Sequence, residues 1–253
     1  MVHFVGAGPG AEDLITLRGA KLLEEADQVI YAGSLVNPAL LDRCKPDCRI
    51  LNSAEMTLEQ VIVAIEEAEQ DGLMTVRLHT GDPSLYGAVR EQTDRLDALR
   101  IPYNVTPGVS SFCAAAASLH AEYTLPGLSQ TLILTRMAGR TPVPERERLE
   151  ELAKHGASMA LFLSAGMLRE VQAALLQGAY TENTPAAIVY KASWPEEKAL
   201  RCTVGTLAET AWEAGITKTA LILVGDFLNG DYARSRLYAP DFTTGYRKGT
   251  DAI

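Results

Sequence analysis

Hydrophobic and polar residues alternate along the first half of the chain in a way that predicts strands and helices in turn. Short apolar runs that stop near glycine, proline or polar residues predict buried strands at Val2–Ala7, Gln28–Tyr31, Gly72–Leu78 and Tyr103–Val105. Between them, apolar residues recur with helical spacing at Thr16–Ala26, Leu58–Ala68, Tyr86–Leu99 and Ser110–Leu119. Alternation of strand and helix implies right-handed crossovers and a mainly parallel sheet.

The pattern changes in the second half, where Pro126-Gly127 marks the transition. Further strands are expected at Thr131–Thr135, Ser158–Leu163, Ala186–Lys191, Leu200–Gly205 and Thr219–Val224. Helices are expected at Glu145–His155, at Leu168–Gln177 and before the last strand. The strand that follows Pro195 is expected to pair with its predecessor as a hairpin, which makes this sheet mixed.

The predicted fold class is therefore α/β, with two α/β domains. Residues 1–122 form an N-terminal α/β domain with a mainly parallel sheet, and residues 123–253 form a C-terminal α/β domain with a mixed sheet. The polar stretch Asp231–Ile253 is expected to be a surface tail.

Composition narrows the classes of function. The chain has 253 residues, of which 47% are hydrophobic and 22% charged, as in ordinary soluble proteins. A net charge of −9 argues against nucleic acid and anionic membranes as partners. The longest apolar stretch, residues 157–168, is shorter than the roughly 20 residues of a membrane span, and nothing at Met1 resembles a signal peptide. We therefore expect a cytoplasmic location.

The four cysteines do not predict a metal site. Cys44 and Cys48 have the spacing C-x3-C, but no second Cys/His pair accompanies them. Free thiols are expected for these two residues, for Cys113 and for Cys202.

Three loops follow predicted strands and carry residues suited to ligand binding. They are Gly6-Ala7-Gly8-Pro9-Gly10-Ala11, His79-Thr80-Gly81-Asp82-Pro83-Ser84 and Thr106-Pro107-Gly108-Val109-Ser110-Ser111. In an open parallel sheet, ligands bind outside the carboxyl ends of the strands. The alternative for Asp82, Ser110 and Ser111 is helix capping, which needs the same residue types.

The first loop matches G-x-G-x-x-[GA], but its context argues against a dinucleotide site. A dinucleotide-binding helix would begin directly after the glycines, whereas the helical pattern begins only near Thr16. The second strand ends at Tyr31-Ala32-Gly33-Ser34, without an acidic residue for a ribose hydroxyl. A nicotinamide-dependent oxidoreductase therefore remains a distant alternative.

Several segments taken together resemble the tetrapyrrole (corrin/porphyrin) methylase family over nearly the whole chain. They read VGAGPG, DLITLRGAKLLEEAD, RLHTGDPSLYG, TPGVSSFCAAAA, KASWPEEK and TALILVG. The resemblance implies the class III methyltransferase type of fold, in which two α/β domains hold S-adenosyl-L-methionine in the cleft between them. It also implies release of S-adenosyl-L-homocysteine and assembly as a homodimer.

Two further segments, YAGSLVNP and RSRLYAPDFTTGYR, narrow the resemblance to members that act in cobalamin biosynthesis. This implies methyl transfer to C-11 of precorrin-4, which gives precorrin-5. A cobalt-bearing form of the substrate remains open, because its metal would belong to the macrocycle and needs no ligand set on the protein. Another methylation of the same pathway also remains open. A methyltransferase acting on ribosomal RNA and a non-catalytic sensor of S-adenosylmethionine are the competing hypotheses from other classes.

The resemblance also implies site residues. Cofactor contacts are expected from Pro9, Thr80, Gly81, Asp82, Leu85, Tyr86, Ser110 and Ser111 in the first domain, and from Leu163, Ala192 and Ala220 in the second. The last three also fit a purely apolar core. Substrate carboxylates are expected to bind Arg18, Arg136, Arg140 and Lys191. All four are cations, and a guanidinium can donate two parallel hydrogen bonds to one carboxylate. Asp82 is the candidate catalytic residue if a protein group removes the ring proton.

Overall fold

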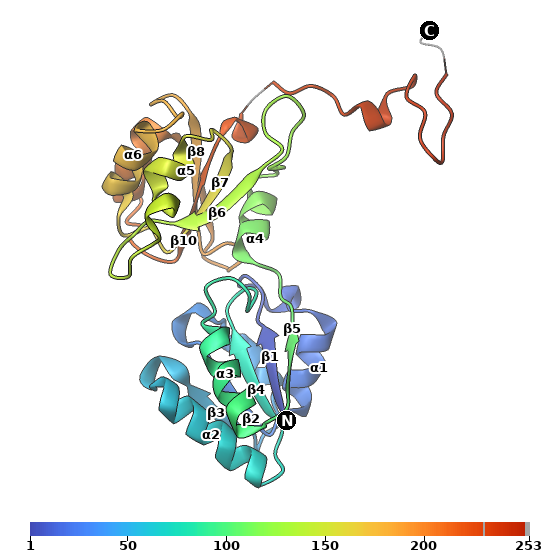
Figure 1. Ribbon diagram of the computed structural model, residues 1–253, viewed down its shortest axis with the longest axis vertical. Coiled ribbons are helices and arrows are strands. Elements are labelled where there is room, and N and C mark those ends of the chain that lie inside the picture. The colour runs from blue at the N-terminus through green and yellow to red at the C-terminus, as the bar shows by residue number, and fades with distance from the viewer. Residues whose placement is uncertain (230, 251–253) are drawn as a thin grey trace. The chain divides into compact units, whose positions relative to one another are not determined.

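The first sheet of the computed structural model is parallel throughout, with the strand order β3-β2-β4-β1-β5 (Figure 1). Its strands are β1 (Val2–Gly6), β2 (Gln28–Tyr31), β3 (Arg49–Asn52), β4 (Thr75–His79) and β5 (Tyr103–Thr106). The predicted parallel sheet is confirmed. The edge strand β3 was missed because its residues are exposed or half-buried and form no continuous apolar run.

Helices cover both faces of this sheet. They are α1 (Leu17–Glu25), α2 (Leu58–Gln70) and α3 (Val89–Leu99), and α4 (Ser111–Ser118) follows β5. On one face Leu23 of α1 packs with Val5 and Leu78, and on the other Ile65 of α2 and Leu96 of α3 pack with Phe4. Thr16 caps α1 by accepting a hydrogen bond from the Gly19 amide, as its position before the apolar pattern predicts.

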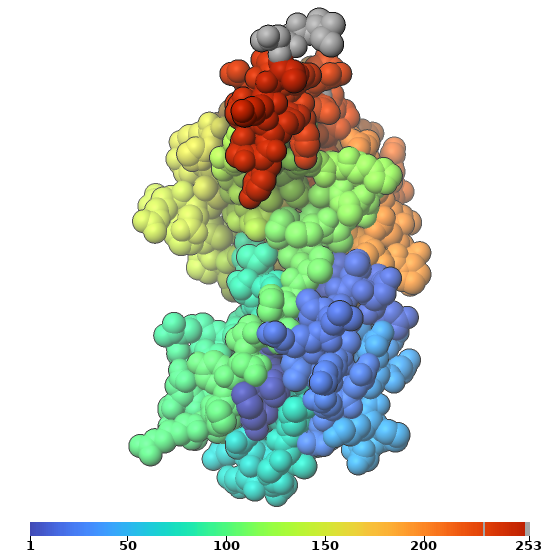
Figure 2. Space-filling model, turned by 90° about the vertical axis from the view of Figure 1, so that its right-hand side faces the viewer, coloured from blue at the N-terminus to red at the C-terminus, as the bar shows by residue number. Residues whose placement is uncertain are grey.

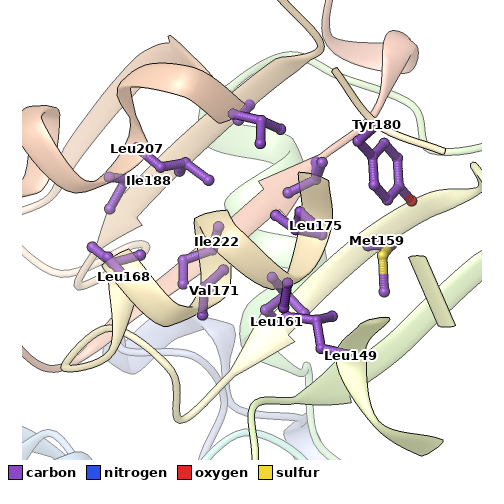
Figure 3. Packing of buried hydrophobic residues seen from close by; sticks show 14 of the residues in the cluster. Leu149, Met159, Leu161, Leu168, Val171, Leu175, Tyr180, Ile188, Leu207 and Ile222 are labelled. Atoms are coloured by element: carbon purple, nitrogen blue, oxygen red, sulfur yellow. The ribbon is translucent and has the colours of Figure 1, made fainter. Parts of the chain in front are cut away.

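The second sheet is mixed, with the order β6-β7-β10-β8-β9. Its strands are β6 (Leu132–Arg136), β7 (Ser158–Phe162), β8 (Pro185–Tyr190), β9 (Lys198–Thr203) and β10 (Ala220–Val224). Only β6 and β7 are parallel, and the predicted hairpin of β8 with β9 is confirmed. Side chains of α5 (Leu149–Ala153), α6 (Leu168–Leu176) and α7 (Leu207–Glu213) form one core with this sheet (Figure 3).

Two predicted helices begin differently. The helix expected at Tyr86–Leu99 begins only at Val89, because Tyr86 and Ala88 adopt left-handed conformations with φ of 56° and 49°. The helix expected at Glu145–His155 is a 3-10 turn, Glu145–Glu147, followed by α5. Arg148 separates the two because its extended ψ of 145° cannot continue a helix.

The structure describes residues 1–229 and 231–250, and they divide into two compact units. The first holds Met1–Ala115 and Lys191–Glu197, and the second holds Ala116–Tyr190 and the described residues from Lys198 onward. The return of residues 191–197 to the first unit was not predicted, and the boundary between residues 122 and 123 stays a prediction. No helix among the described residues is long and apolar enough to cross a bilayer.

The C-terminal segment is exposed along most of its described length (Figure 2). Within the second unit, the Ala233 amide donates a hydrogen bond to the carbonyl oxygen of Pro126. The last part of the predicted tail, residues 251–253, lies outside the described residues.

Candidate functional site

Three backbone turns meet at the carboxyl edge of the first sheet. A short antiparallel bridge joins Gly8 to Gly81: the Gly81 amide lies 2.9 Å from the Gly8 carbonyl oxygen, and the return distance is 3.3 Å. A Cβ atom on Gly6 would lie 2.5 Å from the Gly108 Cα, and one on Gly108 would lie 2.0 Å from the Gly81 carbonyl oxygen. The loops after β1, β4 and β5 therefore pack main chain to main chain, which only glycine permits.

Asp82 links two of these loops. Its Oδ2 accepts a hydrogen bond of 2.8 Å from the Gly108 amide, and its Oδ1 accepts from the amide and hydroxyl of Ser84. Partial burial raises the pKa of Asp82, but the hydrogen bonds from Ser84 and Gly108 outweigh it and bring the pKa below its usual value. The carboxylate is therefore charged at neutral pH and ties the loop after β4 to the loop after β5.

Ser110 and Ser111, in the loop after β5, lie against the loop after β4. A Cβ atom on Gly81 would lie 3.5 Å from the Ser110 Cα and 3.7 Å from the Ser111 amide nitrogen. Ser110 is buried, and its carbonyl oxygen accepts from the Cys113 amide at the start of α4. Pro9, Gly81, Asp82, Ser110 and Ser111 are therefore brought together in the first unit.

Two polar atoms beside these loops have no hydrogen-bond partner among the described residues. They are Oγ1 of Thr80 and Nε2 of His79, and both are shielded from solvent. Burial, and to a smaller extent the nearby charge of Arg77, lower the pKa of His79 to about 3, so the imidazole is neutral. Both atoms belong to the two residues directly before Gly81, and the described residues leave their hydrogen-bonding capacity unused.

Arg77 is a buried cation beneath the loop after β4, and sequence patterns did not identify it as part of the site. Its guanidinium donates to Oε1 of Gln92 at 2.9 Å and to the Ile30 carbonyl oxygen at 3.0 Å. Gln92 in turn donates to the carbonyl oxygen of Ala88. This chain of bonds anchors both ends of residues 77–88, so the loop that carries Asp82 has a fixed base.

The remaining candidates of this loop lie nearer its surface. Leu85 is half-buried, and its amide donates to the Asp82 carbonyl oxygen. Tyr86 is 46% exposed and has a positive φ. Both belong to the first unit, between β4 and α3.

The glycine-rich loop after β1 carries contacts that sequence reasoning missed. The indole N–H of Trp194 donates to the Pro9 carbonyl oxygen, Ser193 Oγ accepts from the Ala11 amide, and Asn37 donates to the Gly10 carbonyl oxygen. The sequence signal that could have revealed these contacts was the tryptophan of KASWPEEK, but the sequence analysis placed that segment in the second domain. Ala192, a predicted cofactor contact, is buried in this same segment.

In the second unit, three candidates share one end of the sheet. The antiparallel register pairs Ile222 of β10 with Leu161 of β7, Leu163 follows the end of β7 at Phe162, and Ala220 begins β10. Arg136 pairs with Phe162 at the end of β6. Leu163 is 62% exposed with a φ of 52°, so it is not the core residue that its apolar neighbours suggest.

The four predicted substrate-binding cations differ in how they are held. The Arg136 guanidinium donates to the carbonyl oxygens of Met137, Thr141 and Pro142, which closes its own loop. Arg140, exposed on that loop, makes no hydrogen bond or ion pair with another described residue. Arg18 is exposed on α1, and Lys191 pairs with Glu196 and lies 5.0 Å from the centre of the Trp194 ring.

Backbone strain concentrates near the candidate residues. Eight non-glycine residues of the described chain have a positive φ, and six of them are, or lie within two residues of, a predicted ligand contact. These six are Tyr86, Ala88, Leu163, Lys191, Ser193 and Thr219. Such conformations cost about 1–3 kcal/mol each and are concentrated at functional sites. Their positions therefore support these loops as candidate functional loops, independently of the family resemblance. No cluster of three metal-binding side chains occurs within the described residues.

Known proteins resemble this chain over nearly its full length. A family model described as Tetrapyrrole (Corrin/Porphyrin) Methylases matches residues 1–208. The cobalt-precorrin-4 C(11)-methyltransferase of Methanocaldococcus jannaschii is 52% identical over 248 residues, which cover 98% of this chain and 96% of that protein. The precorrin-4 C(11)-methyltransferase of Mycobacterium tuberculosis is 45% identical over 240 residues, which cover 94% and 96%.

Solved structures agree with this result. The X-ray structure of a cobalt precorrin-4 methyltransferase, described as a cobalamin biosynthetic enzyme, superposes with a TM-score of 0.88 at 46% identity, covering 90% of this chain and 95% of that one. The uroporphyrin-III C-methyl transferase of Thermus thermophilus, complexed with S-adenosyl homocysteine, has a TM-score of 0.75 at 25% identity, with 94% of each chain covered.

Proposed function

Because this chain belongs to the tetrapyrrole (corrin/porphyrin) methylase family, we propose that it transfers a methyl group from S-adenosylmethionine to C-11 of precorrin-4. The products are precorrin-5 and S-adenosylhomocysteine, and the reaction belongs to cobalamin biosynthesis. The observation that supports this assignment is identity of 45–52% over at least 94% of the chain to C(11)-methyltransferases of precorrin-4 and of cobalt-precorrin-4.

The residues of the first unit suit the methyl donor. The glycine-lined turn lets a ligand approach the main chain, and Thr80 and His79 each hold a buried polar atom without a partner in the described structure. We place Pro9, Thr80, Gly81, Ser110 and Ser111 around the donor. Leu85 and Tyr86 complete this group, and Leu163, Ala192 and Ala220 stay proposed contacts.

When bound, S-adenosylmethionine supplies a sulfonium methyl that is already electrophilic, and the reduced pyrrole carbon is nucleophilic. The chain's own residues therefore need mainly to align the reactants, with the reacting atoms about 3–3.5 Å apart. Asp82 serves this alignment. Both of its carboxylate oxygens accept hydrogen bonds from the loops, and its lowered pKa makes it a weak base. We therefore assign to Asp82 the positioning of the loops rather than removal of the ring proton.

The carboxylates of the tetrapyrrole require cations on a protein whose net charge is −9. Arg140 is the best placed of the four, because its guanidinium is free within the described structure while Arg136 holds the loop that displays it. Arg18 and Lys191 remain further candidates for the same role. Lys191 already contacts Glu196 and the Trp194 ring.

A cobalt-bearing substrate is the second candidate, and a specific observation favours it. The relative at 52% identity and the structure at 46% identity both carry the cobalt-precorrin-4 name, whereas the metal-free name belongs to the relative at 45%. The cobalt would be part of the substrate, so no ligand set on the protein is required.

Incubation with labelled S-adenosylmethionine and precorrin-4, with or without chelated cobalt, tests both assignments. We expect a product heavier by one methyl group, located at C-11 by NMR. A higher kcat/KM for one form of the substrate decides between the two candidates. Binding of S-adenosylmethionine without methyl transfer to either form would instead indicate a sensor.

We further propose that the protein is a homodimer in the cytoplasm. Family resemblance supports the dimer. Light scattering during size-exclusion chromatography measures the mass directly, and a mass near the 27.3 kDa of one chain would contradict the proposal.

A further inference from the structure

Side chains from outside the glycine-rich loop hold three consecutive residues of that loop. The Pro9 carbonyl oxygen accepts from the Trp194 indole at 3.1 Å, and the Gly10 carbonyl oxygen accepts from Asn37 at 2.8 Å. The Ala11 amide donates to Ser193 Oγ at 3.0 Å. The main chain of each of these three residues is therefore tied to a side chain from a distant part of the sequence.

The Trp194 ring also packs directly on Gly10. A Cβ atom on Gly10 would lie 2.0 Å from Cδ1 and 2.2 Å from Nε1 of the indole. Gly10 is absent from the described glycines with positive φ, so its backbone conformation is open to alanine. The indole, and not the main chain, is therefore what requires glycine at position 10.

The segment that presents the indole is itself ordered by local contacts. The Trp194 amide donates to the Lys191 carbonyl oxygen and the Glu197 amide donates to the Trp194 carbonyl oxygen, at 2.9 and 3.0 Å. The Ser193 amide donates to the Glu197 carboxylate. The ammonium of Lys191 lies 5.0 Å from the indole ring centre, where it adds a cation–π contact. The left-handed conformations of Lys191 and Ser193 are held by these bonds.

We propose that Trp194 is a positioning residue for the methyl-donor site. Its indole clamps residues 9–11 in the one conformation that the donor binds, so loop order and donor affinity are coupled. This inference rests on the proposed function, because it assumes that the glycine-rich loop contacts S-adenosylmethionine or its product. The contacts of Trp194 with Pro9 and Gly10 are observed in the structure and do not depend on that assumption.

A double-mutant cycle tests the clamp. Gly10→Ala expels the indole and Trp194→Ala removes it, so each change alone should weaken binding of S-adenosylhomocysteine about tenfold, or ~1.4 kcal/mol. In the Trp194→Ala background, Gly10→Ala meets no ring and should add less than twofold. Additive effects in calorimetry would overturn the proposal.

Fluorescence gives a readout without ligand or turnover. The sequence has two tryptophans, so Trp212→Phe leaves Trp194 as the sole reporter. Trp212 is 83% exposed on α7 and serves as the matched control, since its loss should not change affinity. Gly10→Ala in this background should shift the emission of the ligand-free protein to longer wavelength. Unchanged emission would show that the indole does not pack on Gly10 and would overturn the clamp.

Trp194→Phe separates packing from the hydrogen bond. Phenylalanine keeps a ring over Gly10 but loses the donor to Pro9, so we expect it to recover part of the affinity lost in Trp194→Ala. The loss should fall on the KM of S-adenosylmethionine and not on that of the tetrapyrrole. Equal changes in both would indicate general damage and contradict the positioning role.

Different results would contradict the proposed function and the positioning role of Trp194. If the unaltered protein does not bind S-adenosylhomocysteine, the proposed function is wrong, whatever the fluorescence reports. If it binds with the same affinity after Trp194→Ala, the function stands and the positioning role is wrong.

Discussion

At the scale of single residues, the buried polar groups of β4 explain how the site is held. Arg77 is 6% exposed, and burial lowers its pKa to about 10, so it remains charged at neutral pH. Its guanidinium donates hydrogen bonds to Gln92 and to the Ile30 carbonyl oxygen, which offset the cost of burying the charge. His79, two residues on, is kept neutral beside it. The strand therefore carries one fixed charge and one imidazole whose protonation opposes folding.

His79 predicts a pH dependence of stability. The unfolded chain takes up a proton near the ordinary value of 6.5, whereas the folded chain does so only near 3. Stability should therefore be complete above about pH 6.5 and decline as the pH falls toward 3, with a slope of up to about 1.4 kcal/mol per pH unit. His79→Gln should flatten this decline in urea unfolding measured between pH 4 and 8.

The exposed His155 supplies the control for that experiment. His155→Gln should leave the slope unchanged. If the slope of the unaltered protein matches that of His79→Gln, then His79 is protonated normally and the buried neutral state is wrong.

We predict that Asp82 supports donor binding by holding together the loops after β4 and β5. Asp82→Ala leaves the Gly108 amide without its acceptor and should weaken S-adenosylhomocysteine binding about tenfold, in keeping with ~1.5–3 kcal/mol for a hydrogen bond to a charged group. Asp82→Asn keeps one acceptor and should lose less. Asp94→Ala, on the exposed side of α3, is the control. A kcat that falls steeply in Asp82→Asn while affinity is unchanged would point instead to a proton-transfer role.

At the scale of elements, loops that follow strands carry the candidate chemistry in both sheets. In the turn after β6, one arginine holds the loop on which the proposed substrate-binding arginine lies. Arg136 closes the turn through three carbonyl oxygens, and the closed turn displays Arg140. The two arginines therefore have separable effects.

Arg140→Ala should raise the KM for the tetrapyrrole about two- to fivefold and leave that of S-adenosylmethionine unchanged, because one exposed ion pair is worth up to about 1 kcal/mol. Arg136→Ala should raise the tetrapyrrole KM too, and should also expose residues 137–144 to limited proteolysis. Arg169, an exposed residue of α6, provides a control cation through Arg169→Ala. Proteolysis unchanged by Arg136→Ala would contradict its role in closing the loop.

At the scale of the whole molecule, charge and cofactor class separate the competing functions. A net charge of −9 opposes a polyanionic RNA, while a small carboxylate-bearing substrate needs only a few local cations. The cofactor distinguishes a methyltransferase from a nicotinamide-dependent enzyme. The increase in Tm on adding each ligand to the unaltered protein shows which class of cofactor it binds.

S-adenosylhomocysteine at about 100 times its Kd should stabilise the protein by about 2.7 kcal/mol, and should raise Tm by about 5–10 °C for a chain of this size. NADH at the same concentration should leave Tm unchanged. A rise with NADH alone would reverse the assignment of cofactor class.

Local patterns were sufficient for most of the fold. Apolar runs ending at glycine located β1, β2 and β4, and helical spacing located α1 and α2, because both signals arise from short-range geometry and burial. The edge strand β3 and the late start of α3 escaped prediction. The first has no apolar run, and the second depends on left-handed residues that the tertiary structure holds in place.

Hydrophobic patterns were enough to predict most strands of both sheets and the loops that follow them, and family resemblance added the chemistry. The contacts that hold those loops are visible only in the folded chain: Asp82 on the Gly108 amide, Arg136 on its own turn and Trp194 on Gly10. The contacts of Asp82 and Trp194 join residues that are far apart along the chain. Trp194 lies 185 residues from Pro9, and no periodicity or spacing encodes a hydrogen bond between residues that only folding brings together.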